Sequence, residues 1–162
     1  MLPLALLAPA VVANSSLSLP IPAGYKDASA EVVAARPELK DQEIIQLAGM
    51  RDGAVVASIN LVPSKPVPGR LDDARECAAF ADELREKNDA KSRAWTIVDA
   101  PIGKSCQITI VRKDGHTTVH TLLRGLKNAD WTMTCLFTTG DRASDDVCRR
   151  TVKTIKFRAS SK

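Results

Sequence analysis

The chain has 162 residues, of which 44% are hydrophobic and 26% are charged, and its formal net charge is +4. This composition excludes a disordered or repetitive chain and predicts one domain with a hydrophobic core. The mildly basic charge does not indicate a nucleic-acid partner, because the sequence has one Tyr and no interleaving of aromatic with basic residues.

The N-terminus resembles a secretory leader. Its first thirteen residues, MLPLALLAPAVVA, carry no charge and precede the polar run NSSLS. The stretch is too short to span a bilayer comfortably, so no stable membrane insertion is expected. Val11 and Ala13 place small residues at positions −3 and −1 of a signal-peptide cleavage site after Ala13. We therefore interpret residues 1–13 as a signal peptide and residues 14–162 as a single domain. No Lys or Arg precedes Lys26, so a buried first strand or an N-terminal hydrophobic arm is the alternative.

The first half of the domain predicts strands and one helix. SLSLPIPAGY, residues 16–25, alternates as a short edge strand, and residues 42–48 fit a strand or a helical turn. Residues 53–62 are rich in β-branched residues and predict a strand that runs into the proline-rich loop PSKPVPG. In residues 71–87 apolar side chains recur at helical spacing, which predicts an amphipathic helix with Cys77 on its buried face.

The second half predicts an antiparallel meander and a closing helix. The four predicted strands are AWTIVDAPIG, CQITIVRK, HTTVHTLLRG and WTMTCLFT, and the pair Asp114-Gly115 indicates a tight hairpin between the second and the third. Ser144 is the expected N-cap of a helix over residues 144–157. The predicted fold class is α+β, with a single antiparallel sheet packed with these two main helices.

The cysteine count is even, which favours disulfides in an exported protein. Strand alternation directs Cys135 to the more apolar face of its strand, and helical spacing directs Cys148 toward the sheet. We therefore predict the disulfide between Cys135 and Cys148, and by elimination the disulfide between Cys77 and Cys106. The even count alone leaves three connectivities open.

No catalytic or metal-binding motif is present in the sequence. His116 and His120 form an H-x3-H pair, but four strand residues span about 13 Å, which is too far for one metal ion. Neither a nucleophile nor an orienting partner is signalled for either histidine. We therefore expect a protein that is not an enzyme and that uses no cofactor and no metal.

Basic residues provide the expected contact surface. The C-terminal residues Arg149, Arg150, Lys153, Lys156, Arg158 and Lys162 predict a basic stripe on the side of the helix away from the sheet. The stiff loop at 63–70 and the tight loop at 112–116 would present cations with little ordering cost on binding. The predicted partner-binding residues are Lys65, Arg70, Arg112, Lys113 and His116.

The order of elements resembles the PsbP-like fold. The resemblance covers most of residues 15–158 and depends on element order and on the closing strand WTMTCLF and helix end TIKF. That family includes the extrinsic photosystem II subunit and a nuclear Ran-binding protein, and similar bacterial domains are exported, some of them resembling immunity proteins. The resemblance implies a protein that binds another protein; the cysteine pairs depart from the plant subunit's pattern.

These observations together predict an exported, non-catalytic protein-binding module in the periplasm or secreted from the cell. Its most concrete form is an immunity or inhibitor protein that neutralises an envelope-targeting effector. The alternatives are a small exported hydrolase-like enzyme and an accessory subunit of an envelope complex.

Overall fold

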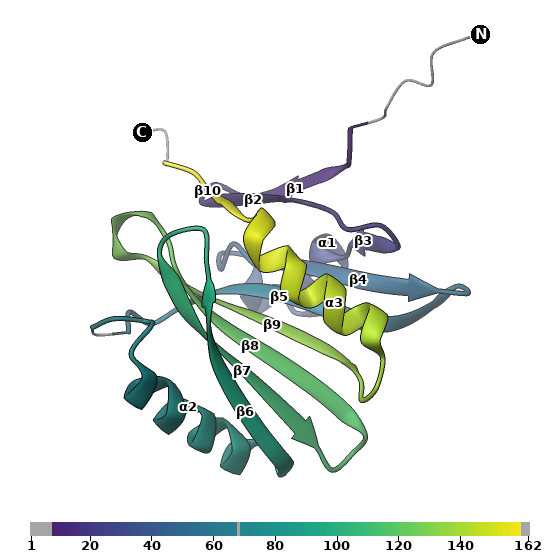
Figure 1. Ribbon diagram of the computed structural model, residues 1–162. Coiled ribbons are helices and arrows are strands. Elements are labelled where there is room, and N and C mark those ends of the chain that lie inside the picture. The colour runs from purple at the N-terminus through teal and green to yellow at the C-terminus, as the bar shows by residue number, and fades with distance from the viewer. Residues whose placement is uncertain (1–7, 68, 160–162) are drawn as a thin grey trace, which may run out of the picture.

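The computed structural model describes residues 8–67 and 69–159 (Figure 1). The helices in this part of the chain are Ser29–Ala35 (α1), Ala74–Lys87 (α2) and Arg142–Thr151 (α3), with short 3-10 turns at Pro37–Leu39, Leu126–Asn128 and Val152–Thr154. The strands are Val11–Ala13 (β1), Leu17–Pro20 (β2), Tyr25–Asp27 (β3), Ile45–Arg51 (β4), Ala54–Ser64 (β5), Ala90–Asp99 (β6), Lys104–Arg112 (β7), His116–Arg124 (β8), Asp130–Thr138 (β9) and Lys156–Phe157 (β10).

The strands form two antiparallel sheets. The large sheet has seven strands in the order β3-β4-β5-β9-β8-β7-β6, and the small sheet has the order β1-β2-β10. The prediction of an α+β fold is confirmed, but the prediction of a single sheet and two main helices is incomplete, because the described residues also form the small sheet and α1. Lys156 and Phe157 pair with Ser18 and Leu17, and no local pattern indicates a pairing between segments so distant in the sequence.

The two long helices lie on opposite faces of the large sheet. Cys135 of β9 is aligned with Val119 of β8, and Val119 with Thr109 of β7, so these three side chains share one face. Cys106, three positions before Thr109, points to the other face. Since Cys148 of α3 is bonded to Cys135 and α2 is bonded to Cys106, α3 and α2 cover opposite faces, and the molecule has three layers (Figure 1).

Both predicted disulfides are confirmed. Cys77 of α2 is bonded to Cys106 of β7, with Cα atoms 5.6 Å apart, and Cys135 of β9 is bonded to Cys148 of α3, with Cα atoms 6.1 Å apart. All four side chains are buried. Each disulfide therefore links one helix to the sheet face that it covers.

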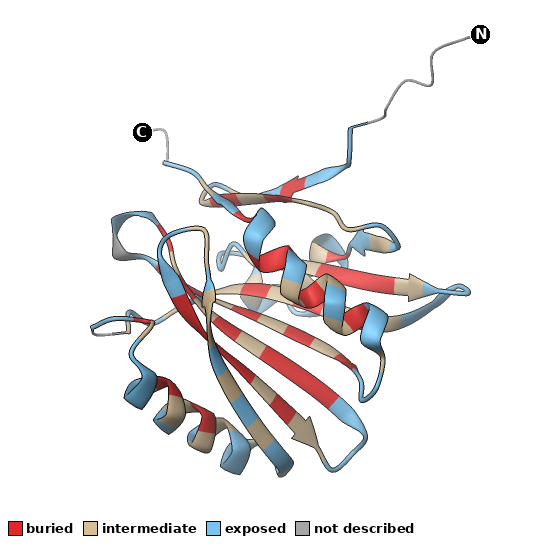
Figure 2. Cartoon of the chain, viewed as in Figure 1, coloured by how far each residue is buried: buried red, intermediate tan, exposed pale blue. Residues whose placement is uncertain are grey.

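Each of the two long helices covers its own hydrophobic core. The larger core lies beneath α3 and joins the inner face of β4, β5, β8 and β9 to the small sheet through side chains such as Leu17, Leu61, Met133 and Val152. The smaller core lies beneath α2 and includes Ala81, Ile108 and Ile110. Figure 2 shows the buried residues concentrated along the central strands and on the inner side of α3.

The described part of the predicted signal peptide is extended. Residues 11–13 form β1, which pairs with β2, and Val12 is 6% exposed. The alternative to a signal peptide given above included a first strand, and residues 11–13 form such a strand. Residues 1–7 lie outside the described residues, and cleavage after Ala13 stays a prediction.

Both long helices begin at aspartate caps. The side chain of Asp73 accepts hydrogen bonds from the backbone N–H groups of Arg75 and Glu76, so α2 begins at Ala74 and not at residue 71. Asp141 caps α3, and Ser144, the predicted cap, lies within the helix and donates its hydroxyl to Asp141. The closing helix ends at Thr151, well before the predicted residue 157.

The cap of α2 gives a first measurable prediction. Asp73→Ala is expected to lower the free energy of unfolding by about 1 kcal/mol, because two N–H groups in the first turn lose their acceptor. Urea denaturation measures the change. The matched control is Asp72→Ala, which removes an ion pair with Arg70 and should lower the free energy of unfolding less than the loss of the cap does. Equal losses in the two variants would contradict the assignment of the cap.

Candidate functional site

A hollow of about 450 Å³ lies between α3 and the hairpin of β6 and β7. We call it the α3 groove. This volume is in the range of ligand-binding clefts. The strands line it with Thr96, Ile97, Val98, Asp99, Lys104 and Gln107, and α3 and the turn after it line it with Arg149, Arg150, Val152 and Lys153. Its wall is thus a mixture of apolar side chains and cations.

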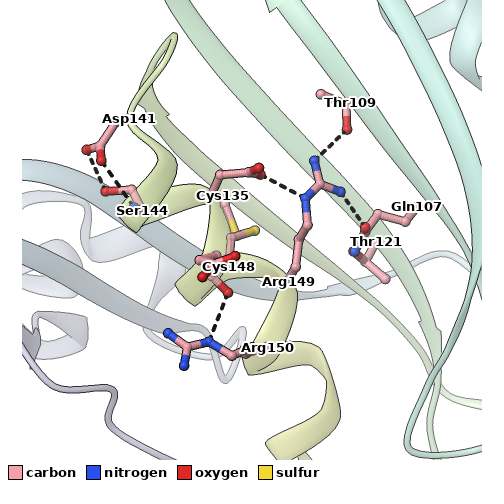
Figure 3. Close-up of polar contacts among 11 residues, drawn as sticks. Gln107, Thr109, Thr121, Cys135, Asp141, Ser144, Cys148, Arg149 and Arg150 are labelled. Carbon is pink, nitrogen blue, oxygen red and sulfur yellow. Dashed lines mark hydrogen bonds and ion pairs between the residues drawn. A yellow bond between two sulfur atoms is a disulfide. The ribbon is translucent and has the colours of Figure 1, made fainter.

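Arg149 forms the inner end of the groove and bridges the helix to the sheet (Figure 3). Its Nη1 donates to Gln107 Oε1 at 2.7 Å, its Nη2 to Thr109 Oγ1 at 3.2 Å and its Nε to Asp145 Oδ1 at 2.9 Å. It also borders a second hollow of about 180 Å³ near the N-terminal end of α3. The guanidinium group therefore divides the space between α3 and the sheet into two parts.

The sheet holds Arg149 through a buried polar pair. Gln107 is 3% exposed and donates its amide to the hydroxyl of Thr121, which is fully buried, at 3.1 Å. The amide oxygen of Gln107 then faces Arg149 and accepts its hydrogen bond. Buried polar groups that are hydrogen-bonded favour one arrangement, so Gln107 helps to orient the guanidinium group of Arg149 toward the sheet.

The placement of Arg149 corrects the predicted basic stripe. Arg149 points toward the sheet and not away from it, because the helix turns it to the same side as Asp145, one turn earlier. Arg150 and Lys153 are exposed, in agreement with the stripe. Lys162 lies outside the described residues.

The α3 groove has an excess of positive charge. Four of its lining side chains are cations, namely Lys104, Arg149, Arg150 and Lys153, whereas Asp99 is the lining carboxylate. Lys104 donates a hydrogen bond to Asp99 at 2.8 Å, and this bond lowers the pKa of the Asp99 carboxyl group. Within the described residues, Arg150 and Lys153 form no ion pair. The groove is therefore suited to a carboxylate or another anion.

The two histidines form no catalytic arrangement. His116 contacts Asp114 on an exposed hairpin, with Nδ1 and Oδ1 3.3 Å apart. His120 lies on the face covered by α2, where its ring nitrogens are 3.0 Å from Thr118 Oγ1 and 3.3 Å from Thr134 Oγ1. Burial lowers the pKa of His120 to about 4. Across residues 8–67 and 69–159, no group of three or more His, Cys, Asp or Glu side chains is arranged to hold a metal ion.

The two loops predicted to bind a partner lie at opposite ends of the large sheet. The loop at 63–70 follows the end where Ser64 pairs with Asp130, and the loop at 112–116 leads into the end where His116 pairs with Thr138. Along β9, Asp130 and Thr138 are separated by about 26 Å at the usual rise of a strand. The two predicted contact loops therefore do not form one continuous patch at a single end of the sheet, and Pro68 of the first loop lies outside the described residues.

Most of the predicted contact cations are neutralised within the protein. Arg70 pairs with Asp72 at 2.8 Å, Arg112 with Asp114 at 2.7 Å and Lys113 with Asp89 at 2.6 Å; His116 contacts the same Asp114, and Lys65 is exposed. Such exposed pairs add little to stability but reduce the local net charge. The role of these five residues in binding stays a prediction.

Arg149, Arg150 and Lys153 belong to the predicted basic stripe, but the strand residues that line the α3 groove were not predicted. The signal for them was present in β7, where Ser105, Gln107 and Thr109 alternate with apolar residues on the face opposite to Cys106. A polar row on a buried strand face requires a polar partner. The (i, i+4) pair of Asp145 and Arg149 on the adjacent helix provides that partner.

Comparison with known proteins identifies the fold. No protein-family model and no curated protein sequence matches the chain. Among solved structures, the chain is similar to the Ran-binding protein Mog1p of Saccharomyces cerevisiae, with a TM-score of 0.56, 14% identity, and coverage of 86% of this chain and 89% of Mog1p. A variant of protein Mog1 gives a TM-score of 0.55, 16% identity and the same coverage. At these identities the likeness establishes the fold alone.

Proposed function

We propose that this chain is an exported, non-catalytic protein-binding module of the PsbP-like family. In its most concrete form it is a periplasmic immunity or inhibitor protein that neutralises an envelope-targeting effector. The observation that carries the proposal is the α3 groove, an open hollow with four basic lining residues, of which Arg149 is hydrogen-bonded to Gln107 of the sheet. Such a surface suits recognition of a charged partner.

Two further observations support the proposal. Disulfides persist in oxidising compartments, and both pairs in this small domain have normal Cα separations. The similar solved structures are of a Ran-binding protein, so this fold accommodates protein recognition in at least one relative. No helix in the described ranges is both long and apolar enough to cross a membrane.

Affinity capture from an envelope extract tests the proposal, with the oxidised protein from Asn14 onward as bait. We expect one protein to be retained at a stoichiometric ratio, to co-elute with the bait in size-exclusion chromatography and to lose its toxic or enzymatic activity when bound. Mass spectrometry of the bait purified from its native compartment should give an N-terminus at Asn14 and no free thiol.

Two results would overturn the proposal. The first is a lack of any specific partner together with measurable turnover of a peptidoglycan or ester substrate, which would favour the hydrolase-like alternative. The second is a native protein with four free thiols, which would place it in a reducing compartment.

A further inference from the structure

The large sheet ends in a long strand that has one neighbour. β6 contains ten residues and pairs with β7, whereas β3 at the opposite edge has three residues. Alternate residues of an antiparallel edge strand direct their N–H and C=O groups away from the sheet. Proteins usually shorten, charge or cover such an edge to prevent strand addition. Within the described residues, β6 is the long edge that the fold leaves open.

The charged residues of β6 lie toward its two ends. Lys91 and Arg93 lie in its first half, where an irregularity in register also occurs between Ala90 and Ser92, and Asp99 is its last residue. The segment AWTIV, residues 94–98, has no charged residue and is rich in residues that favour strands. On the side toward α3, Ala94 and Thr96 are exposed. These five residues therefore offer an unprotected template for another strand.

This template adjoins the α3 groove. Thr96 and Val98 of β6 line the same hollow as Lys104, Arg150 and Lys153. A strand added beside β6 would place every second side chain on the face that carries α3. Those side chains would therefore enter a region in which Arg150 and Lys153 form no ion pair within the described residues, whereas Lys104 and Arg149 pair with Asp99 and Asp145.

We propose that an extended segment of the protein partner pairs with β6 as an eighth strand and directs acidic side chains into the α3 groove. This inference rests on the proposed protein-binding function. The main-chain hydrogen bonds of strand addition supply affinity, and the alternate side chains supply specificity. The acidic character follows from charge complementarity with Arg150 and Lys153, the lining cations that form no ion pair within the described residues.

A second copy of this chain is a less suitable occupant. Pairing of two β6 strands would bring two α3 grooves close to one another, each with its excess of cations. Like charges placed together across an interface disfavour association. An acidic strand from another protein removes this repulsion and neutralises the groove.

Amide hydrogen exchange of the oxidised protein, measured by NMR, tests the inference. The probe is the peptide TEVEVEVT, which places glutamates on one face of a strand. We expect it to slow exchange of the outward amides within residues 94–98 at least tenfold at saturation. The peptide TKVKVKVT, and the acidic peptide with its pairing edge N-methylated, should leave these amides unprotected.

Charge-reversal variants distinguish peptide binding in the α3 groove from general electrostatic attraction between an acidic peptide and a basic protein. The double variant Arg150→Glu/Lys153→Glu should weaken peptide binding about tenfold, because two favourable contacts become repulsive. Lys156→Glu is the matched control, since Lys156 is exposed on β10 and does not line the groove, and it should change binding less than twofold. Circular dichroism should show all three proteins folded.

Several outcomes would overturn the inference. They are the absence of protection in β6 at millimolar peptide, equal binding of the lysine peptide, and equal losses in the groove and control variants. Protection of β6 that rises with protein concentration without peptide would identify a second copy as the occupant. A captured partner that binds the charge-reversed variant as tightly as the parent protein, and leaves the β6 amides unprotected, would refute this inference while the proposed function stands. Failure to capture any partner would refute the proposed function itself.

Discussion

Replacing Cys77 and Cys106 together by alanine is expected to lower the free energy of unfolding by about 3.6 kcal/mol. The disulfide joins residues 29 positions apart, and the chain-entropy relation assigns this value to a closed loop of that size. Both side chains are buried, so the variant also loosens the contact between α2 and β7. Urea denaturation of the oxidised proteins measures the change.

The second disulfide provides the matched comparison. Cys135 and Cys148 are 13 positions apart, and their joint replacement by alanine should cost about 3 kcal/mol, slightly less than the longer loop. A loss below about 1 kcal/mol in both variants would show that the helices stay docked without the covalent links. A large loss in one variant alone would show that only that link stabilises the fold.

Acidification from pH 7.5 to pH 4 is expected to remove about 3 kcal/mol of stability through His120 alone. Burial lowers the pKa of His120 from its usual value of 6.5 to about 4 in the folded protein. The unfolded chain therefore binds a proton at a higher pH than the folded protein does. The contribution is fully present above pH 6.5 and is lost as the pH falls through this range toward 4.

His120→Gln should abolish this part of the pH dependence. Glutamine does not titrate and can still hydrogen-bond to Thr118 and Thr134, the partners of the imidazole ring. The measurement is the free energy of unfolding at pH 7.5, 5.5 and 4. Retention of the full pH dependence in His120→Gln would contradict the role of burial.

Local patterns predicted the elements and the covalent links of this fold. Cys135 was assigned to the more apolar face of its strand by alternation, and it is buried together with Trp131, Met133 and Phe137 at alternate positions of that strand. The placement of Cys77 and Cys148 on buried helix faces led to both disulfides. These predictions succeeded because the period of a strand or a helix is contained in a few neighbouring residues.

The features of the candidate site depend on distant neighbours. The position of β6 at the edge of the sheet depends on the pairing of all the strands. Hydrophobic periodicity does not predict this pairing, and in particular it does not predict that β9 lies between β5 and β8. Arginine is typical of exposed helix positions. The side chain of Arg149 points toward the sheet because Gln107 on the facing strand accepts its hydrogen bond. The second sheet likewise depends on contacts between the two ends of the chain.

The strand order also governs how the domain is made on the ribosome. β5 is complete at Ser64, but its neighbour β9 is complete only at Thr138, which is 138 − 64 = 74 residues later. At usual rates of translation this interval lasts about 4–15 s. Throughout it, one edge of β5 has no strand beside it, although apolar residues such as Ile59 and Leu61 are already synthesised. The nascent chain is therefore most exposed to misassociation while α2 and the strands β6 to β8 are being made, and a truncation before β9 would leave the central sheet permanently open.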